Sequence, residues 1–257
     1  MSLMAAPAGP PEPVPDAAED PPSPAAMVLA AGLGRRMRPL TATRPKPLVP
    51  VAGRTLLDRA LDTLRRGGVR QAVVNVHFLA DQVEAHLAAR DCGLSVAVSD
   101  ERALLLETGG GILKALPLLS TDPFLAINAD TVWVEGPVPA VQRLIRRWDG
   151  EAMDALLMLV PLARAHNHGG RGDFHMDPLG RLSRRRPGRL APFVFTGLQM
   201  LARRLFEGEP LRPFSMNLLW DRAAAAGRLY GLVHEGVWFD VGTAAAVPVT
   251  ETLLGQV

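Results

Sequence analysis

Apolar residues in this chain occur in short runs that alternate with helix-like stripes. Residues 26–30 form a wholly apolar run, typical of a buried strand, and Gly32 follows it. Between Thr55 and Gly67, apolar residues recur with the 3.6-residue spacing of a helix that buries one face. The same alternation continues to about residue 150. We expect strands at 26–30, 72–76, 94–99, 124–128 and 155–160, and helices at 55–67, 81–89, 111–119 and 138–149.

This β-α-β-α order predicts an α/β fold with a mostly parallel sheet that helices cover on both faces. Beyond residue 160 the pattern is less regular and contains short apolar runs separated by polar, glycine-rich loops. We therefore expect one three-layer, Rossmann-like domain over 25–257, elaborated in its C-terminal half. In that half we expect short antiparallel strands at 174–176, 182–183 and 193–195, a strand at 229–234, and helices at 216–226 and 244–254.

The first 24 residues differ from the rest of the chain in composition. They contain eight prolines and four acidic residues, but no basic residue. Such a segment lacks the positive start and apolar centre of a secretory signal, and we expect residues 1–24 to be a disordered, Pro-rich acidic tail. The other 233 residues carry 28 basic and 22 acidic side chains, a net charge of +6. A basic body without long Lys or Arg blocks favours small anionic ligands over nucleic acid.

Cysteine content and hydropathy narrow the class of protein. The single cysteine, Cys92, excludes an intramolecular disulfide framework and a cysteine-rich metal site. No apolar run approaches the roughly 18 residues that a membrane span requires. Aromatic residues make up 5% of the chain, few for stacking on nucleic-acid bases. We expect a cytoplasmic protein, a monomer or small homo-oligomer, that binds neither nucleic acid nor a membrane.

A glycine-containing loop follows the first strand and carries the strongest chemical signal. It reads Ala31-Gly32-Leu33-Gly34-Arg35-Arg36-Met37-Arg38-Pro39. Glycines after a buried strand let backbone N–H groups approach a phosphate or a base closely. The loop lacks the third glycine of a dinucleotide-binding fingerprint and the Gly-Lys-Ser/Thr of a P-loop. Its three arginines favour a loop that surrounds a polyphosphate, with a βα turn bearing solvated arginines as the alternative.

Lys46 is the second chemical signal. In Arg44-Pro45-Lys46-Pro47, the two prolines restrict the backbone on either side of the lysine and keep it out of a helix. The chain contains 26 arginines and only two lysines, Lys46 and Lys114. Because an ammonium group is a compact point charge, a lysine held in this way suits a phosphate oxygen.

These two segments together show a family resemblance. The patterns L-A-A-G-x-G-x-R-M-x-P-L-T and R-P-K-P-L-V-P-V resemble those of the sugar-1-phosphate nucleotidylyltransferases, and among them most closely the bacterial N-acetylmuramic acid 1-phosphate uridylyltransferases. The resemblance covers roughly residues 25–254. It implies the nucleotide-diphospho-sugar transferase type of the fold, with a nucleotide-binding half at 25–150 and a sugar-phosphate-binding half at 151–257.

The resemblance places the nucleotide at the ends of the first strands. It implies that Arg36 is the phosphate-binding catalytic arginine and that Lys46 is the catalytic lysine at the α-phosphate. The segment 106–111, Leu-Glu-Thr-Gly-Gly-Gly, resembles the family's base-recognition loop, and its glycines would direct free N–H groups toward a ligand. Arg35 stands where the family often has Thr. The implied nucleotide-binding residues are Leu29, Ala30, Ala31, Gly32, Gly34, Arg35, Asn75, Glu107, Gly109 and Gly110.

Two aspartates at the ends of apolar runs are implied to bind Mg²⁺. Asp130 ends the triplet at 128–130, Asn-Ala-Asp, where the family usually has N-G-D, and Asp240 lies in a segment that resembles F-D-x-G-T. Mg²⁺ takes one or two protein carboxylates and otherwise uses water and phosphate oxygens. We expect Asp130 and Asp240 to share one ion.

The sugar-phosphate side departs further from the family pattern. Many relatives carry a Glu-Lys-Pro triplet whose Glu binds sugar hydroxyls, and this chain has Arg184-Arg185-Arg186-Pro187 instead. We expect one of these arginines, Arg189 or Arg171 to pair with the lactyl carboxylate of muramic acid, with a solvated loop as the alternative. The implied sugar-phosphate residues are Asn167, Gly172, Asp173, Thr196 and Gly197.

The resemblance implies a Mg²⁺-dependent enzyme that condenses an NTP, UTP by this resemblance, with N-acetylmuramic acid 1-phosphate to give an NDP-sugar and pyrophosphate, as in cell-wall sugar recycling. Within the enzyme class, the alternatives are GTP with mannose 1-phosphate, CTP with a small phosphorylated alcohol, or another sugar 1-phosphate. Outside it, the alternative is a non-catalytic regulatory homologue that binds a nucleotide sugar. Such a homologue would have lost Arg36, Lys46 or an aspartate, and this chain retains all of them.

Overall fold

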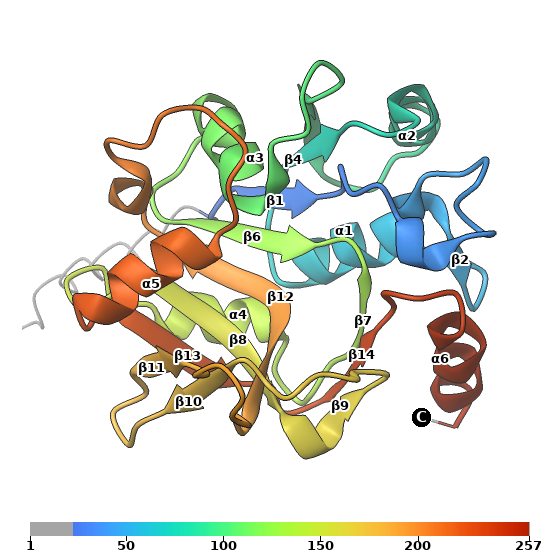
Figure 1. Cartoon of the computed structure of the whole chain (residues 1–257). Coiled ribbons are helices and arrows are strands. Elements are labelled where there is room, and N and C mark those ends of the chain that lie inside the picture. Colours follow the sequence, from blue (N-terminus) through green and yellow to red (C-terminus); the bar gives the residue numbers. More distant parts are fainter. Residues whose placement is uncertain (1–22, 257) are drawn as a thin grey trace, which may run out of the picture.

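The computed structural model describes residues 23–256, so the tail expected at 1–24 lies outside the described residues except for Ser23 and Pro24. A nine-stranded sheet forms the centre of the protein (Figure 1). Its main path has the order β11-β10-β12-β6-β1-β4-β5, and β8 joins it through β12 and carries β13 on its other side. The strands are β1 (Ala26–Leu29), β4 (Gln71–Val76), β5 (Ser95–Asp100), β6 (Phe124–Asn128), β8 (Ala155–Pro161), β10 (Phe174–Met176), β11 (Leu182–Arg184), β12 (Phe193–Leu201) and β13 (Leu229–Val233).

Strand direction divides this sheet. The four strands β6, β1, β4 and β5 are mutually parallel, so their carboxyl ends lie at one edge. β12 runs antiparallel to both β6 and β8, and the hairpin β10–β11 extends the sheet beyond it. The expected α/β class, with a mostly parallel sheet and antiparallel strands in the C-terminal half, is confirmed.

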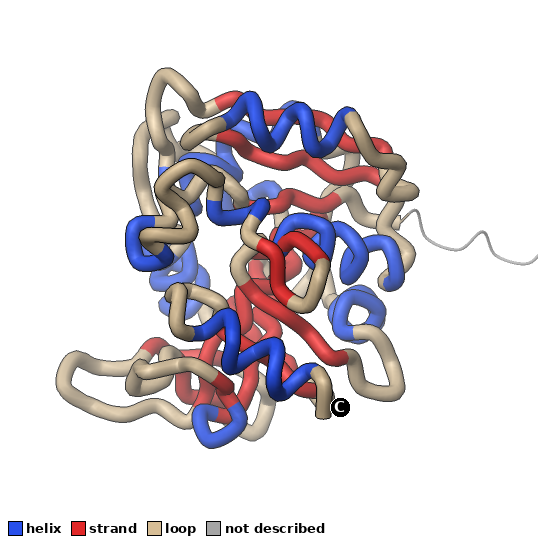
Figure 2. Tube along the Cα trace, turned by 90° about the vertical axis from the view of Figure 1, so that its right-hand side faces the viewer, coloured by secondary structure: helices blue, strands red, loops and turns tan. Residues whose placement is uncertain are grey.

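Helices cover both faces of the sheet (Figure 2). One core packs α1 (Leu56–Arg66), α2 (Ala80–Ala88) and α4 (Ala140–Arg147) against the strands, and a second core packs α3 (Glu107–Ala115) and α5 (Asn217–Ala225) against the other face. Successive side chains of β1 lie on opposite faces of the sheet, since Val28 belongs to the first core and Met27 to the second. Alternation across a strand that is buried on both sides explains the continuous apolar run at 26–30.

Helix α1 shows why the predicted helices form where they do. The Thr55 side chain accepts a hydrogen bond from the Asp58 N–H at 3.1 Å and so caps the helix start. The apolar stripe, which includes Leu57, Leu61 and Leu64, is buried. At the far end, a Cβ on Gly67 would overlap the side chain of Val141 on α4, so glycine permits the two helices to approach.

Two of the expected elements were wrong in extent. The expected strand at 193–195 is the first part of β12, which continues to Leu201 with a bulge between Phe195 and Gln199. Gly197 and Gln199 interrupt the apolar pattern that a buried strand usually shows, so the full length of β12 was not predicted. The expected helix at 111–119 is α3, which begins at Glu107, followed by the 3₁₀ turn η3 (Leu116–Leu118). The glycines at 109–111 therefore lie inside the helix rather than before it.

A second, three-stranded sheet was not predicted. It has the order β7-β14-β9, formed by β7 (Thr131–Val134), β14 (Val237–Asp240) and β9 (Ala165–His166). Figures 1 and 2 show the last helix, α6 (Ala246–Leu254), apart from the other helices at the side where the chain ends. The short pair β2 (Pro50–Val51) and β3 (Arg54–Thr55) and the 3₁₀ turns η1 (Arg35–Met37), η2 (Lys46–Leu48), η4 (Leu162–Arg164) and η5 (Arg203–Phe206) complete the described elements.

Among the helices of residues 23–256, none has the length and apolar character that crossing a membrane would need.

Candidate active site

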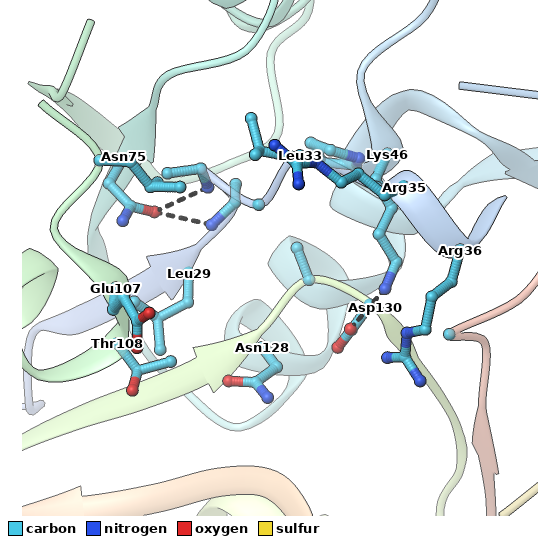
Figure 3. A pocket seen from close by; sticks show the side chains of 18 of the residues that line it. Leu29, Leu33, Arg35, Arg36, Lys46, Asn75, Glu107, Thr108, Asn128 and Asp130 are labelled. Atoms are coloured by element: carbon cyan, nitrogen blue, oxygen red, sulfur yellow. Dashed lines mark hydrogen bonds and ion pairs between the residues drawn. The ribbon is translucent and has the colours of Figure 1, made fainter. Parts of the chain in front are cut away.

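A cavity of about 500 Å³ opens at the carboxyl edge of the parallel strands, and we call it the edge cavity (Figure 3). The ends of β1, β4 and β6 and the loops that follow them meet there. The structure brings most of the expected nucleotide, catalytic and metal residues into its lining. These residues are Leu29, Ala30, Ala31, Gly32, Gly34, Arg35, Arg36, Lys46, Asn75, Glu107 and Asp130.

The loop after β1 forms one wall of the edge cavity with its backbone. A Cβ placed on Gly32 would meet no atom within 4 Å, so this glycine leaves the backbone open to an incoming group. Gly34 has a φ of +62°, and a Cβ there would lie 3.0 Å from Thr41 and 3.1 Å from Lys46. The buried Thr41 hydroxyl donates to the Gly34 carbonyl at 2.8 Å. Glycine at position 34 therefore permits the tight turn that places Lys46 beside the loop.

Asn75 supports this loop from beneath (Figure 3). Its side-chain oxygen accepts hydrogen bonds from the N–H groups of Ala30 at 2.7 Å and Ala31 at 3.2 Å. Its Nδ2 donates to the Glu101 carboxylate at 2.6 Å. The acceptor oxygen of Asn75 is thus used within the protein, and the residue acts on a ligand chiefly by fixing the backbone that surrounds it.

Glu101 is a residue that the sequence reasoning missed. Its side chain is fully buried, and besides Asn75 it accepts a hydrogen bond from the Leu106 N–H at 3.0 Å. One carboxylate therefore joins the loop after β1 to the segment that carries Glu107. A Cβ on Gly111 would lie 2.8 Å from the Glu101 oxygen, so that glycine makes room for the carboxylate. A glutamate shortly after the predicted strand, at the edge where the strands end, was the available signal.

The glycines of α3 pack against the chain that precedes α5. The N–H groups of Gly109 and Gly110 both donate to the Phe214 carbonyl, at 2.8 and 3.2 Å. A Cβ on either glycine would overlap the Phe214 ring or the Arg212 carbonyl. These N–H groups are therefore used within the protein, and contact of Gly109 and Gly110 with the nucleotide stays a prediction.

Lys46 and Asp130 face each other in the edge cavity. The Lys46 Nζ lies 2.6 Å from the Asp130 carboxylate, and the lysine side chain is 12% exposed against 32% for the aspartate (Figure 3). Pro47, next to the lysine, is buried and fixes the backbone of η2. A partly buried cation and carboxylate that neutralise each other can each turn to a ligand of opposite charge when one arrives.

Asp130 lies in the turn directly before β7, and Asp240 ends the adjoining strand β14. Asp240 pairs with Thr131 across the β7–β14 ladder, and the Val241 N–H donates to the Asp130 carbonyl at 3.0 Å. Both side chains are partly exposed, at 32% and 29%. Within residues 23–256, no cluster of three or more metal-ligating side chains occurs. Two oxygen donors from neighbouring backbone positions, without further protein ligands, fit a Mg²⁺ ion that completes its shell with water and phosphate oxygens.

Arg35 and Arg36 occupy the mouth of the edge cavity on η1. Both are exposed, and neither forms an ion pair with any carboxylate of residues 23–256. A Cβ on Gly242, which also lines the cavity, would lie 3.1 Å from the Arg36 guanidinium and 2.8 Å from Asp240. Two guanidinium groups without counter-ions give the mouth a positive charge suited to phosphate.

The expected sugar-phosphate residues are not brought together. Asn167 donates its side-chain N–H to Thr250 of α6 at 2.9 Å, and Thr196 is fully buried with its hydroxyl donating to the Met158 carbonyl at 2.7 Å. Both side chains are thus engaged within the protein, and their contact with the sugar phosphate stays a prediction.

The other three of these residues have separate roles. Gly197, with a φ of +90°, lies against the Asn128 side chain, which lines the edge cavity. Gly172, with a φ of +75°, is buried, and a Cβ there would overlap the Ala191 carbonyl. Only Asp173 lines a cavity, a second one considered below, and its carboxylate accepts a hydrogen bond from the Phe195 N–H at 2.9 Å.

Comparisons with known proteins identify the family of this chain. Residues 26–227 match the family described as the MobA-like NTP transferase domain. The chain is 44% identical over 234 residues to the N-acetylmuramate alpha-1-phosphate uridylyltransferase of Caulobacter vibrioides, covering 90% of this chain and 97% of the relative. It is 35% identical over 232 residues to the enzyme of the same name from Neisseria meningitidis serogroup B, with 90% and 98% covered.

A solved structure shows the same fold. A UDP-glucose pyrophosphorylase in complex with UDP-glucose superposes with a TM-score of 0.73 at 16% identity, covering 90% of this chain and 98% of that one. At that identity the likeness concerns the fold alone.

Proposed function

The chain belongs to the family of MobA-like NTP transferase domains, and we propose that it transfers the uridylyl group of UTP to N-acetylmuramate 1-phosphate, releasing pyrophosphate. The observation that carries the proposal is the meeting of Arg36, Lys46 and Asp130 around one cavity at the carboxyl edge of a parallel sheet. Open α/β sheets bind ligands at this edge. The 44% identity to an N-acetylmuramate alpha-1-phosphate uridylyltransferase supports the choice of both substrates.

In this reaction an oxygen of the sugar phosphate attacks the α-phosphorus of the nucleotide. A new P–O bond forms as the bond to the β-phosphate breaks, and pyrophosphate leaves with the bonding electrons. The attacking oxygen is already anionic, so no general base is needed, and catalysis consists of in-line positioning and neutralisation of charge.

The residues of the edge cavity match these tasks. The backbone at Gly32 and Gly34 receives the nucleotide, and Lys46 neutralises charge on the α-phosphate. Arg36, with Arg35 beside it, binds the β- and γ-phosphates and the departing pyrophosphate. Asp130 and Asp240 would hold Mg²⁺, which supplies further neutralisation of the phosphate oxygens when bound. For this to occur, Lys46 must exchange Asp130 for the phosphate.

A substrate panel tests the proposal. Purified protein is incubated with Mg²⁺, each of the four ribonucleoside triphosphates and a set of sugar 1-phosphates, and pyrophosphate release is measured. UTP with N-acetylmuramate 1-phosphate should give the highest kcat/KM. Preference for GTP with mannose 1-phosphate would support a guanylyltransferase instead. Absence of pyrophosphate with every pair, combined with binding of a UDP-sugar, would support a non-catalytic homologue.

A further inference from the structure

A second cavity, of about 330 Å³, lies between the hairpin β10–β11, the start of β12 and helix α5, and we call it the hairpin cavity. Figure 1 shows the hairpin and α5 together at the lower left of the molecule. Its lining includes Asp173, Arg184, Arg185, Phe195, Asn217 and Trp220.

The hairpin cavity lies beside the edge cavity. Asn217 follows Ser215, which lines the edge cavity, and the Met216 N–H between them donates to Thr108 of the edge cavity at 2.9 Å. On the other side, Phe195 is two residues from Gly197, which packs on Asn128 of the edge cavity. A ligand whose phosphate occupies the edge cavity can therefore extend a substituent toward the hairpin cavity along β12.

Arg185 is held in this cavity without a counter-ion. Its Nε donates to the Gly172 carbonyl at 2.8 Å, and its Nη1 makes longer bonds to the carbonyls of Arg186 and Arg189. Within residues 23–256 it forms no ion pair. Neutral carbonyls fix the guanidinium but leave its charge unpaired, which is the arrangement that a carboxylate ligand requires.

Arg184 differs from its neighbour in this respect. Its Nη1 lies 3.3 Å from the Asp221 carboxylate and 3.4 Å from the Asn217 carbonyl. Its charge is thus partly neutralised. Of the other candidate arginines, Arg171 is exposed, donates to the Gly188 carbonyl and does not line the cavity. The structure therefore distinguishes Arg185 from the other arginines of this region.

The floor of the hairpin cavity is aromatic. The rings of Phe195 and Trp220 meet edge to face with centroids 4.8 Å apart. The Trp220 N–H donates a hydrogen bond to the Gln199 side-chain oxygen at 2.9 Å, so only the ring of the indole is available to a ligand. A cationic wall over an aromatic floor suits a group that carries both a carboxylate and a methyl group.

We propose that the hairpin cavity receives the lactyl ether of N-acetylmuramate 1-phosphate, with its carboxylate on Arg185 and its methyl group on the Phe195–Trp220 floor. The proposal rests on the function proposed above. Arg185 is then the residue that distinguishes N-acetylmuramate 1-phosphate from N-acetylglucosamine 1-phosphate, which lacks the lactyl group.

The test measures kcat/KM with UTP for three sugars: N-acetylmuramate 1-phosphate, its lactyl carboxamide analogue and N-acetylglucosamine 1-phosphate. In Arg185→Ala, kcat/KM for the lactyl acid should fall about 10- to 100-fold, as expected for a hydrogen-bonded ionic contact, while the value for N-acetylglucosamine 1-phosphate stays within about twofold. In the wild type, amidation of the lactyl group should cause a loss of the same size. In Arg185→Ala, amidation should change little, because the two changes remove one interaction.

Two further variants complete the design. Arg185→Lys keeps the positive charge but loses the paired N–H donors of the guanidinium. It should retain part of the preference for N-acetylmuramate 1-phosphate over N-acetylglucosamine 1-phosphate. Arg147→Met removes an exposed arginine at the end of α4 and should leave all three values unchanged. Equal losses for all sugars in Arg185→Ala, or unchanged discrimination, would overturn the assignment of the hairpin cavity alone. A wild-type enzyme that does not use N-acetylmuramate 1-phosphate would overturn the proposed function as well.

Discussion

The two cavities differ in the part of the chain that forms them. The edge cavity lies at the ends of parallel strands, where the backbone at Gly32 and Gly34, held by the Asn75 amide, shapes one wall. The hairpin cavity is built from side chains that antiparallel strands and α5 bring together, chiefly Arg185 and Trp220.

If the two cavities take the proposed substrates, we expect this difference to let the fold change the sugar while keeping the nucleotide. Phosphates present the same shape in every nucleotide, so a rigid backbone loop can bind them. Sugars differ in single substituents, and a side chain can change without altering the strands. We expect substitutions in the edge cavity to affect the chemical step for every sugar, and substitutions in the hairpin cavity to affect the choice of sugar.

The largest effect is expected at Lys46. Lys46→Ala should lower kcat by about 10²–10³-fold with every sugar phosphate, because it removes a preorganised charge from the reacting phosphate. Steady-state kinetics with saturating UTP measures this loss. Retention of more than about a tenth of the activity would remove Lys46 from the chemistry. Lys114→Ala, which deletes the other lysine of the chain, a half-buried residue of α3 outside the edge cavity, is the matched control.

The sequence predicted the edge cavity well because its signals are local. Glycines after a buried strand, a lysine between prolines and an aspartate ending an apolar run each indicate function from a few neighbouring residues. Glu101 was missed because its role depends on Asn75 and Leu106, which β4 and the loop after β5 place around it.

The hydrogen-bond partners on the sugar side could not be predicted from the sequence, for a related reason. Thr196 and Asn167 matched family patterns, yet their partners, Met158 and Thr250, are fixed only by the antiparallel pairing of β12 with β8 and by the position of α6. The arginines at 184–186 and 189 were alike in sequence. In the structure, Arg185 differs from the others because its guanidinium donates to backbone carbonyls and to no carboxylate of the described residues.

A smaller effect on activity is expected from substitution of Asp240. Asp240→Asn should raise the Mg²⁺ concentration needed for half-maximal activity by about 10- to 100-fold, since one of two anionic oxygen donors is lost. A Mg²⁺ titration of pyrophosphate release at fixed UTP measures this shift. Asp221→Asn, which changes an exposed carboxylate of α5, provides the comparison. An unchanged Mg²⁺ dependence in Asp240→Asn would exclude the residue as a ligand.

The next largest effect is expected from the buried Glu101 carboxylate, which bonds to Asn75 and to the Leu106 N–H. Glu101→Gln places an amide where two N–H donors require acceptors, and it should raise KM for UTP about tenfold. The value of KM for the sugar phosphate should stay within about twofold. The exposed Glu151→Gln gives the matched control. Equal increases for both substrates would indicate general loss of structure instead of a role at the nucleotide.

The smallest effects on activity are expected from Asn167 and Thr196, whose side chains form hydrogen bonds within the protein. Asn167→Ala and Thr196→Val should each leave kcat/KM within about twofold. Thr196→Val should lower the free energy of unfolding by about 1–3 kcal/mol, since it leaves the buried Met158 carbonyl without its donor. Chemical denaturation measures that loss. A tenfold fall in activity with unchanged stability would return Thr196 to the substrate site.

The network of Glu101 and Asn75 also has a thermodynamic consequence. Because Ala30, Ala31 and Leu106 are already hydrogen-bonded to these two side chains, the loops proposed to bind the nucleotide are held in place by the protein itself. The conformational entropy of fixing them is therefore lost during folding, at about 1–2 kcal/mol per residue, and not during association. Affinity for the nucleotide then depends on the stability of the sheet beneath it, so a substitution deep in the core could weaken binding without touching the ligand.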